Sequence, residues 1–178
     1  IRTAVQFIFS GSHDRMTELA FGNQKVDFEA KCGNENVQRM PEIEQWAKDI
    51  YDFVARKFGE ENIISFVVHL DETTAHAHCD IVPVNEQGRI SYKDVFHGHN
   101  KAEYKQFILQ LHNELAEVNS KWGLARGTSK VLTGAKGHTT ESYRRWLNQE
   151  CDSLEERRSN LQNAISELNK ELATAMTK

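Results

Sequence analysis

The stretch NIISFVVHLDETTAHAHCDIVPVN, residues 62–85, decides the fold and raises the question of function. Its first part is rich in β-branched and aromatic residues, which predicts a strand over residues 62–70. Residues 76–85 predict the next strand, and the short connection between the two makes an antiparallel hairpin. Three histidines, two consecutive acids and a cysteine therefore gather around one end of a predicted sheet.

The histidines of this hairpin are predicted to share one face. Alternate side chains of a strand point the same way, so His76 and His78 lie together. Antiparallel pairing brings His69, at the end of the preceding strand, opposite that face. Asp71 and Glu72 then lie at the rim of the group.

This combination of side chains is typical of a metal site. Three neutral imidazole nitrogens can bind a divalent first-row metal and leave its other positions open. A neighbouring carboxylate can orient a ligand histidine or a bound water. Such ligands favour manganese, zinc, cobalt or nickel over magnesium, which prefers oxygen. The alternative left open is a set of polar loop residues that crowd together without a metal.

The rest of the chain predicts an α+β fold, an antiparallel sheet flanked by helices, with a long C-terminal helix. Apolar residues at three- and four-residue steps indicate the helices, and turn residues separate the strands. We divide the chain into a core, residues 1–140, and a helical extension, residues 141–178. The further elements expected in the core are strands over residues 4–9 and 90–92 and helices over residues 41–58 and 100–122, the second capped by Asn100 and Glu103.

The extension carries leucines at seven-residue spacing, which indicates a coiled-coil seam of about four repeats. Arg158 interrupts the seam and weakens this interpretation. A homodimer through this helix, a single helix that docks on its own domain, and a helix that projects as a linker to further C-terminal sequence all remain open. The seam comprises Leu147, Leu154, Leu161 and Leu168, with Cys151, Arg158, Ile165 and Leu172 each four residues further on.

Composition narrows the class of protein. A net charge of -4 and a pI near 6.1 argue against a generally polycationic nucleic-acid binder, but not against a local basic patch. Three widely spaced cysteines without a CxxC pair fit a reducing cytoplasm. Among them, Cys79 is expected to be a small buried residue and not a ligand. No apolar run reaches the roughly 18 residues of a membrane span.

The segment HLDETTAHAHCDIVPVNEQGRISYKDVF, residues 69–96, resembles the histidine motif of the Mob/Pre (MobV-type) relaxases, the nicking enzymes of mobilisable plasmids and transposons. The resemblance extends over most of residues 2–146. Ala75 departs from the family, whose members usually have proline at that place. The matching positions are His69, Asp71, Glu72, His76, His78, Pro83, Gly88, Arg89, Ser91 and Lys93.

The resemblance implies an HUH-type relaxase fold and a metal-dependent, site- and strand-specific DNA endonuclease and transesterase. Such an enzyme nicks single-stranded DNA at an origin of transfer, in the bacterial cytoplasm, and mobilises a plasmid or transposon. It implies that His69, His76 and His78 bind one divalent metal ion, manganese first, with magnesium, zinc, cobalt or nickel as alternatives. Glu72 becomes the nearby acid, as ligand partner or proton acceptor, and Asp71 an orienting residue.

The resemblance places the nucleophile, usually a histidine, in an N-terminal segment well before the first strand. We therefore expect it to lie upstream of Ile1. Within the chain, His13 has no role in the family, and Tyr104 falls on the apolar stripe of its helix and is expected to be core.

A glycine-punctuated, basic segment follows the second long helix and is expected to contact DNA phosphates. A solvated loop is the alternative for this segment. For the chain as a whole, a small-molecule metalloenzyme using the same histidines and a non-catalytic DNA-binding module remain open. The DNA-binding candidates are Arg126, Lys130, Lys136, His138 and Arg144.

Overall fold

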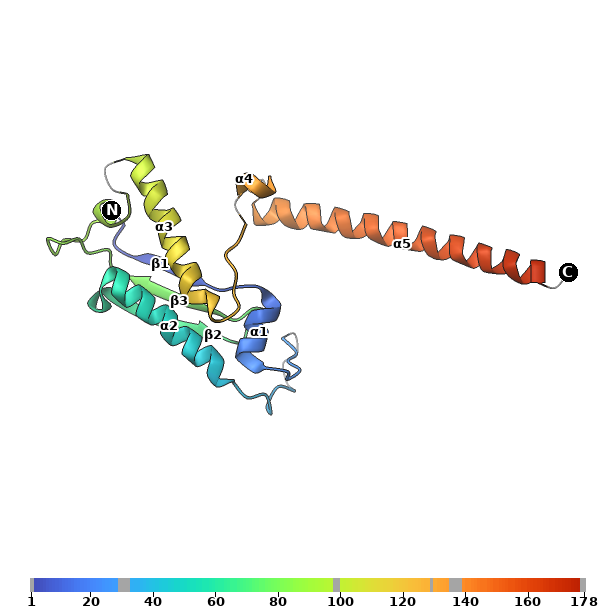
Figure 1. Ribbon diagram of the computed structural model, residues 1–178, viewed down its shortest axis with the longest axis horizontal. Helices are drawn as coiled ribbons and strands as arrows, with labels where there is room; N and C mark the ends of the chain where they lie inside the picture. The colour runs from blue at the N-terminus through green and yellow to red at the C-terminus, as the bar shows by residue number, and fades with distance from the viewer. Residues whose placement is uncertain (1, 29–32, 98–99, 129, 135–138, 177–178) are drawn as a thin grey trace. The chain divides into compact units, whose positions relative to one another are not determined.

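The computed structural model describes residues 2–28, 33–97, 100–128, 130–134 and 139–176 (Figure 1). These form two compact units, residues 1–127 and 128–178, which are described separately. Within the described ranges, no helix combines the length and the apolar character that a membrane span requires. The elements of the first unit are β1 (Val5–Phe9), α1 (His13–Phe21), α2 (Pro41–Phe58), η1 (Glu60–Asn62), β2 (Ile63–His69), β3 (His76–Ile81), η2 (Lys93–His97) and α3 (Lys101–Ser120).

The three strands form one antiparallel sheet in the order β1-β3-β2, so that β3 of the predicted hairpin is central and β2 lies at one edge (Figure 1). In the β2–β3 pair, His69 is the partner of His76, and Val67 is the partner of His78. In the β1–β3 pair, Ile8 is the partner of His78. The predicted antiparallel pairing of the hairpin, with His69 opposite the face of His76 and His78, is therefore confirmed.

The two faces of this sheet differ in burial. Along β3 the residues alternate between half-buried and buried, starting from a half-buried His76. The buried set, Ala77, Cys79 and Ile81, belongs to the hydrophobic core together with Trp46 of α2. The histidine face carries apolar side chains that are strongly exposed within the described structure: Ile8 at 63% and Val67 at 50%.

The helices begin and end where the sequence indicates. Proline occupies the start of α2, as suits a position without an intrahelical N–H partner, and Gly59 follows its end at φ +87°. Asn100 caps α3, because its side chain accepts hydrogen bonds from the backbone N–H groups of Ala102 and Glu103.

Two indole hydrogen bonds join α2 to α3 and the segment that follows it. The buried Trp46 donates from Nε1 to Asn119 Oδ1 at 3.0 Å. Trp122 donates from Nε1 to Asp49 Oδ2 at 2.7 Å. These bonds give a hydrogen-bond partner to indole N–H groups that burial would otherwise leave unpaired.

The expected strand over residues 90–92 is wrong. It is reduced to one isolated antiparallel bridge between Val84 and Ile90. The Asn85 side chain accepts from the N–H of Arg89, which closes a tight turn. The Ser91 hydroxyl accepts from the N–H of Asp94, so the helical turn η2 follows the bridge directly.

The second unit contains α4 (Lys130–Thr133) and the single long helix α5 (Thr140–Met176). The seam leucines of α5 are exposed in the isolated chain, with Leu154 at 61% and Leu168 at 62%. The predicted class, α+β with an antiparallel sheet, flanking helices and a long C-terminal helix, is confirmed.

Candidate metal centre

Three imidazole rings meet at the loop end of the hairpin. The ring centroids of His69 and His76 are 5.1 Å apart, and those of His76 and His78 are 4.9 Å apart. His69 and His78 are also separated by 4.9 Å. The cross-strand pairing of His69 with His76 and the two-residue step to His78 produce this arrangement.

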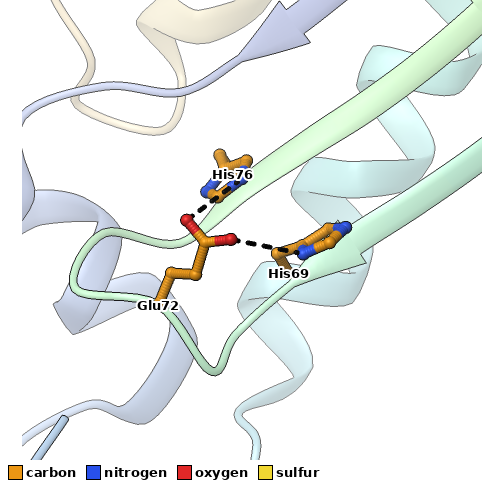
Figure 2. Close-up of side chains that lie close together, drawn as sticks. All are labelled: His69, Glu72 and His76. Carbon is orange, nitrogen blue, oxygen red and sulfur yellow. Dashed lines mark ion pairs between the residues drawn. The ribbon is translucent and has the colours of Figure 1, made fainter. Parts of the chain in front are cut away.

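Glu72 lies between two of these rings, as Figure 2 shows. Its Oε1 is 3.7 Å from His69 Nδ1, and its Oε2 is 3.9 Å from His76 Nε2. One potential ligand atom from each of His69, Glu72 and His76 lies within 4.8 Å of the others. The ring of His78 adjoins this group.

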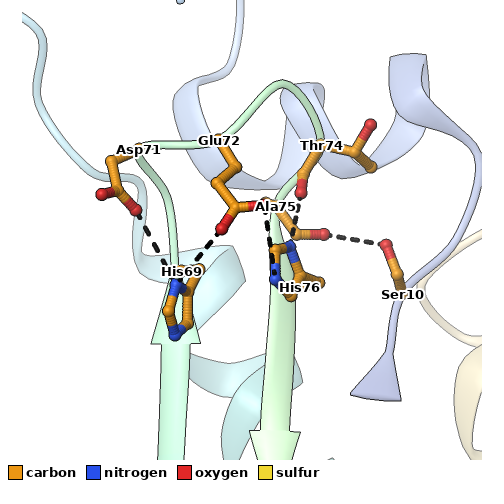
Figure 3. Close-up of polar contacts among 7 residues, drawn as sticks. All are labelled: Ser10, His69, Asp71, Glu72, Thr74, Ala75 and His76. Atoms are coloured by element: carbon orange, nitrogen blue, oxygen red, sulfur yellow. Dashed lines mark hydrogen bonds and ion pairs between the residues drawn. The ribbon is translucent and has the colours of Figure 1, made fainter.

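A backbone carbonyl fixes the proton of His76. His76 Nδ1 lies 2.8 Å from the carbonyl oxygen of Thr74 (Figure 3). A carbonyl can only accept, so Nδ1 carries the proton in the neutral ring, and Nε2 presents its lone pair toward Glu72. A hydrogen bond of this kind commonly orients metal-binding histidines.

The β1–α1 connection holds the loop that carries Thr74. Ser10 Oγ donates to the carbonyl oxygen of Ala75 at 2.9 Å (Figure 3), and Ala75 is buried at 2% exposure. His13 Nδ1 lies 3.2 Å from the Thr74 hydroxyl. Sequence reasoning did not single out Ser10 or Thr74 and gave His13 no role, because partners 61 to 65 residues apart leave no local pattern.

Further acids lie close to the histidines. Asp71 Oδ1 is 4.0 Å from His69 Nδ1, and its side chain is 88% exposed. Asp80 follows His78 on the same face of β3, where the Ser65 hydroxyl donates to it at 2.7 Å. Negative charge beside imidazole nitrogens makes this end of the sheet attractive to a cation.

Cys79 is separated from the histidine group by the sheet itself. It is fully buried on the core face. Burial, with a smaller contribution from the charge of Asp80, raises the pKa of the Cys79 thiol to about 11. A thiol that stays protonated at neutral pH is a poor ligand, as expected for this position.

The DNA-binding candidates belong to both units. Arg126 is exposed in the first unit, and its Nη1 donates to Asn113 Oδ1. Lys130 lies on α4, and Arg144 is exposed on α5. Lys136 and His138 lie outside the described residues. Tyr104 packs against the core, in agreement with its place on the apolar stripe of α3.

The fold and the histidine group define an α+β protein with a candidate divalent-metal centre. A family model described as plasmid recombination enzyme (Mob_Pre) matches residues 34–145. The chain belongs to this plasmid recombination enzyme family, which confirms the resemblance to the Mob/Pre relaxases.

Individual relatives agree with this membership. The type 1 plasmid recombination enzyme of Staphylococcus aureus is 37% identical over 105 residues, 58% of this chain and 25% of the relative. A plasmid recombination enzyme of a Bacillus species is 27% identical over 138 residues, 74% of this chain and 30% of the relative. The chain thus spans about a quarter to a third of the length of these relatives.

Among solved structures, the chain is similar to a Mn-bound MobM relaxase domain in complex with plasmid oriT DNA. The sequence identity is 21%, the TM-score is 0.48, and the similarity covers 81% of each chain.

Proposed function

We propose that this chain is part of a DNA relaxase, which binds single-stranded DNA at an origin of transfer and nicks and transfers that strand. The observation that carries the proposal is the convergence of His69, His76 and His78 on an exposed sheet face, in a chain of the plasmid recombination enzyme family. The relaxase core is taken as residues 1–140, and residues 141–178 form a helical extension.

The donor set fits a divalent ion, and we propose that the three histidines hold it. His76 offers a lone pair at Nε2, because Thr74 occupies its other nitrogen. We propose manganese first, as the resemblance to the Mob/Pre relaxases implies, with magnesium, zinc, cobalt or nickel as alternatives; imidazole nitrogens and a carboxylate can bind ions of this group. When bound, such an ion supplies positive charge that polarises a phosphoryl oxygen of DNA.

The two acids of the loop, Glu72 and Asp71, are proposed to orient the histidine rings, and Glu72 also to accept a proton during the reaction. Glu72 lies less than 4 Å from both His69 and His76, so its carboxylate can hold their rings in place or accept a proton during attack on phosphorus. Asp71 Oδ1 lies 4.0 Å from His69 Nδ1, and Asp71 is proposed to orient that ring.

The proposed DNA path uses the basic residues Arg126, Lys130, Lys136, His138 and Arg144. Neutralisation of phosphates by such side chains gives affinity that depends on salt but not on sequence. The exposure of Arg126 and Arg144 leaves both guanidinium groups accessible to a phosphate backbone.

The position of the apolar cavity weighs against a small-molecule metalloenzyme. A cavity of about 340 Å³ is lined by Ile43, Tyr51, Phe66 and Val68, among others. Phe66 is the cross-strand partner of the core residue Cys79, so this cavity borders the face of the sheet opposite the histidines. An open histidine face suits a long polyanion such as DNA better than a small enclosed substrate.

We further propose that α5 forms a homodimer through its exposed leucine seam, and that the protein acts in the bacterial cytoplasm. Leucine at one fixed position of successive heptads favours pairing of two helices. Replacing Leu154 and Leu161 by alanine should abolish a dimer seen by analytical ultracentrifugation. Equal dimer content in the wild type and the variant would contradict the pairing.

Fluorescence anisotropy with single- and double-stranded forms of one 30-nucleotide sequence, selected from a random pool for binding, tests the proposed function. The chain should prefer the single strand, bind it more tightly with Mn²⁺ than with EDTA, and lose the Mn²⁺ effect in His76→Ala. The logarithm of affinity should fall with that of salt by about 0.7 per neutralised phosphate. Equal binding of both forms, unaffected by metal and by the substitution, would overturn the proposal.

A further inference from the structure

A surface cleft of about 530 Å³ lies directly beside the candidate metal centre. A cleft of this size can take one small group, such as a single nucleoside of a longer strand. Its lining includes Asp71, Glu72, Thr74 and His76, from the loop and strand that carry the metal centre. It also includes Ile8 of β1, Ser10 just after that strand, and Phe28 in the segment after α1.

The residues that line the cleft disfavour the binding of a phosphate inside it. It contains the carboxylates of Asp71 and Glu72, and neither lysine nor arginine is among its described lining residues. A phosphodiester would meet negative charge without a compensating cation. An uncharged group with N–H donors and a flat apolar surface fits better, because the carboxylates and hydroxyls of the lining accept hydrogen bonds, and Ile8 and Phe28 are apolar.

Phe28 provides the flat surface. The ring is half-buried and is supported by two others: Phe21, with centroids 6.1 Å apart, and His13, at 6.3 Å. A supported aromatic ring is the usual platform for stacking a base of single-stranded nucleic acid. Ile8, which is 63% exposed, adds apolar surface to the same cleft.

The polar and the apolar residues of the cleft differ in whether the family model covers them. Asp71, Glu72 and His76 lie within residues 34–145, which match the family model, whereas Ile8 and Phe28 precede that range. The acidic residues and the histidine of the cleft therefore lie in the part of the chain that matches the family model, and its apolar residues lie in a part that the match does not cover.

We propose that this cleft binds one nucleoside of the single-stranded DNA, with its base stacked on Phe28. The phosphate adjacent to this nucleoside is then the one that reaches the metal ion held by the histidines. The inference rests on the proposed function and adds a subsite to it. Because the cleft adjoins Glu72 and His76, a nucleoside there fixes which phosphate of the strand reaches the metal centre.

The test compares two probes, a 12-nucleotide deoxythymidine strand and an abasic strand with the same number of phosphates. Fluorescence anisotropy with Mn²⁺ present gives the ratio of their affinities. The wild type should favour the strand with bases. Phe28→Ala and Phe28→Leu should reduce that preference about fivefold or more, because stacking one base contributes about 1–3 kcal/mol. Both variants should bind the abasic strand as the wild type does.

A matched control separates the cleft from general packing. Tyr51 is another half-buried ring, in contact with Phe66 and lining the apolar cavity rather than the cleft. Tyr51→Leu should keep the wild-type preference. Ile8→Trp adds bulk at an exposed position of the cleft and leaves Phe28 in place. It should lower the preference for the strand with bases. This variant tests the site even where the Phe28 variants do not fold.

The outcomes distinguish this inference from the function on which it rests. If the folded Phe28 variants and Ile8→Trp all keep the wild-type preference, the nucleoside site is overturned while single-strand binding stands. If the wild type binds neither probe, the proposed function fails and the subsite fails with it. Mn²⁺ affinity, measured by calorimetry without DNA, should be the same in the wild type and in Phe28→Leu.

Discussion

The Thr74 carbonyl oxygen lies 2.8 Å from His76 Nδ1, and this contact determines which nitrogen of His76 faces Glu72. The carbonyl belongs to the loop between the two strands of the hairpin, so loop conformation and ring orientation are coupled. A metal centre at this place therefore depends on residues that bind no metal themselves.

Glu72→Gln tests the carboxylate between the rings. The amide keeps the size of the side chain but loses the charge that faces His69 and His76. Removing such an orienting partner typically lowers metal affinity about 10- to 100-fold. Isothermal titration with Mn²⁺ measures the change. His112→Ala, at an exposed position of α3, is the control and should bind as the wild type does. Unchanged affinity in Glu72→Gln would remove Glu72 from the centre.

Ser10→Ala tests the connection between β1 and the loop. The Ser10 hydroxyl donates to the carbonyl of Ala75, so its loss should reduce the free energy of unfolding by about 1 kcal/mol and weaken Mn²⁺ binding. Ser120→Ala removes a similar hydroxyl-to-carbonyl bond within α3 and should leave Mn²⁺ binding unaltered. Urea unfolding and metal titration provide the two values. Equal metal affinity in the two variants would show that the loop holds its shape without Ser10.

The hairpin could be predicted from the sequence, whereas the support of its loop could not. Period-two alternation and the short connection after His69 are local signals, and they determine the register that brings His69 opposite His76. The bonds from Ser10 and His13 join residues more than 60 positions apart, through a loop without regular structure. Their formation depends on the packing of β1 beside β3, which no local pattern encodes.

The failure of the predicted strand over residues 90–92 has a local origin instead. Its β-branched and aromatic residues favour extended structure, but the Ser91 hydroxyl binds the N–H of Asp94 and begins a helical turn. Side chains of this type compete with strand pairing by binding nearby backbone groups.

Asn119→Ala tests the bond that joins α2 to the end of α3. It leaves the Nε1 proton of the buried Trp46 without its acceptor, which should cost about 1–3 kcal/mol in the free energy of unfolding. Gln110→Ala, which removes an exposed bond to Glu114, should cost less than 0.5 kcal/mol, as surface substitutions usually do. Chemical denaturation followed by tryptophan fluorescence measures both. Similar losses in the two variants would contradict the role assigned to the buried bond.

Cys79 should resist alkylation in the folded chain, whereas Cys151 should react. The Cys79 thiol is buried and its pKa is raised to about 11, so little thiolate forms at pH 8, while Cys151 is exposed on α5. Mass spectrometry of peptides after iodoacetamide treatment, with and without urea, compares the two. Rapid modification of Cys79 without urea would place it outside the core.

The central claim is that His69, His76 and His78 together hold one divalent ion. The most direct measurement is Mn²⁺ binding by electron paramagnetic resonance, which reports free ion, for the wild type and the three single alanine variants. The account predicts one Mn²⁺ per wild-type chain and a loss of tight binding in each variant, because each variant lacks one of the three imidazole ligands. His78→Ala is decisive, because Glu72 with His69 and His76 already forms a compact donor group without it. Wild-type stoichiometry and affinity in His78→Ala would contradict the three-histidine centre.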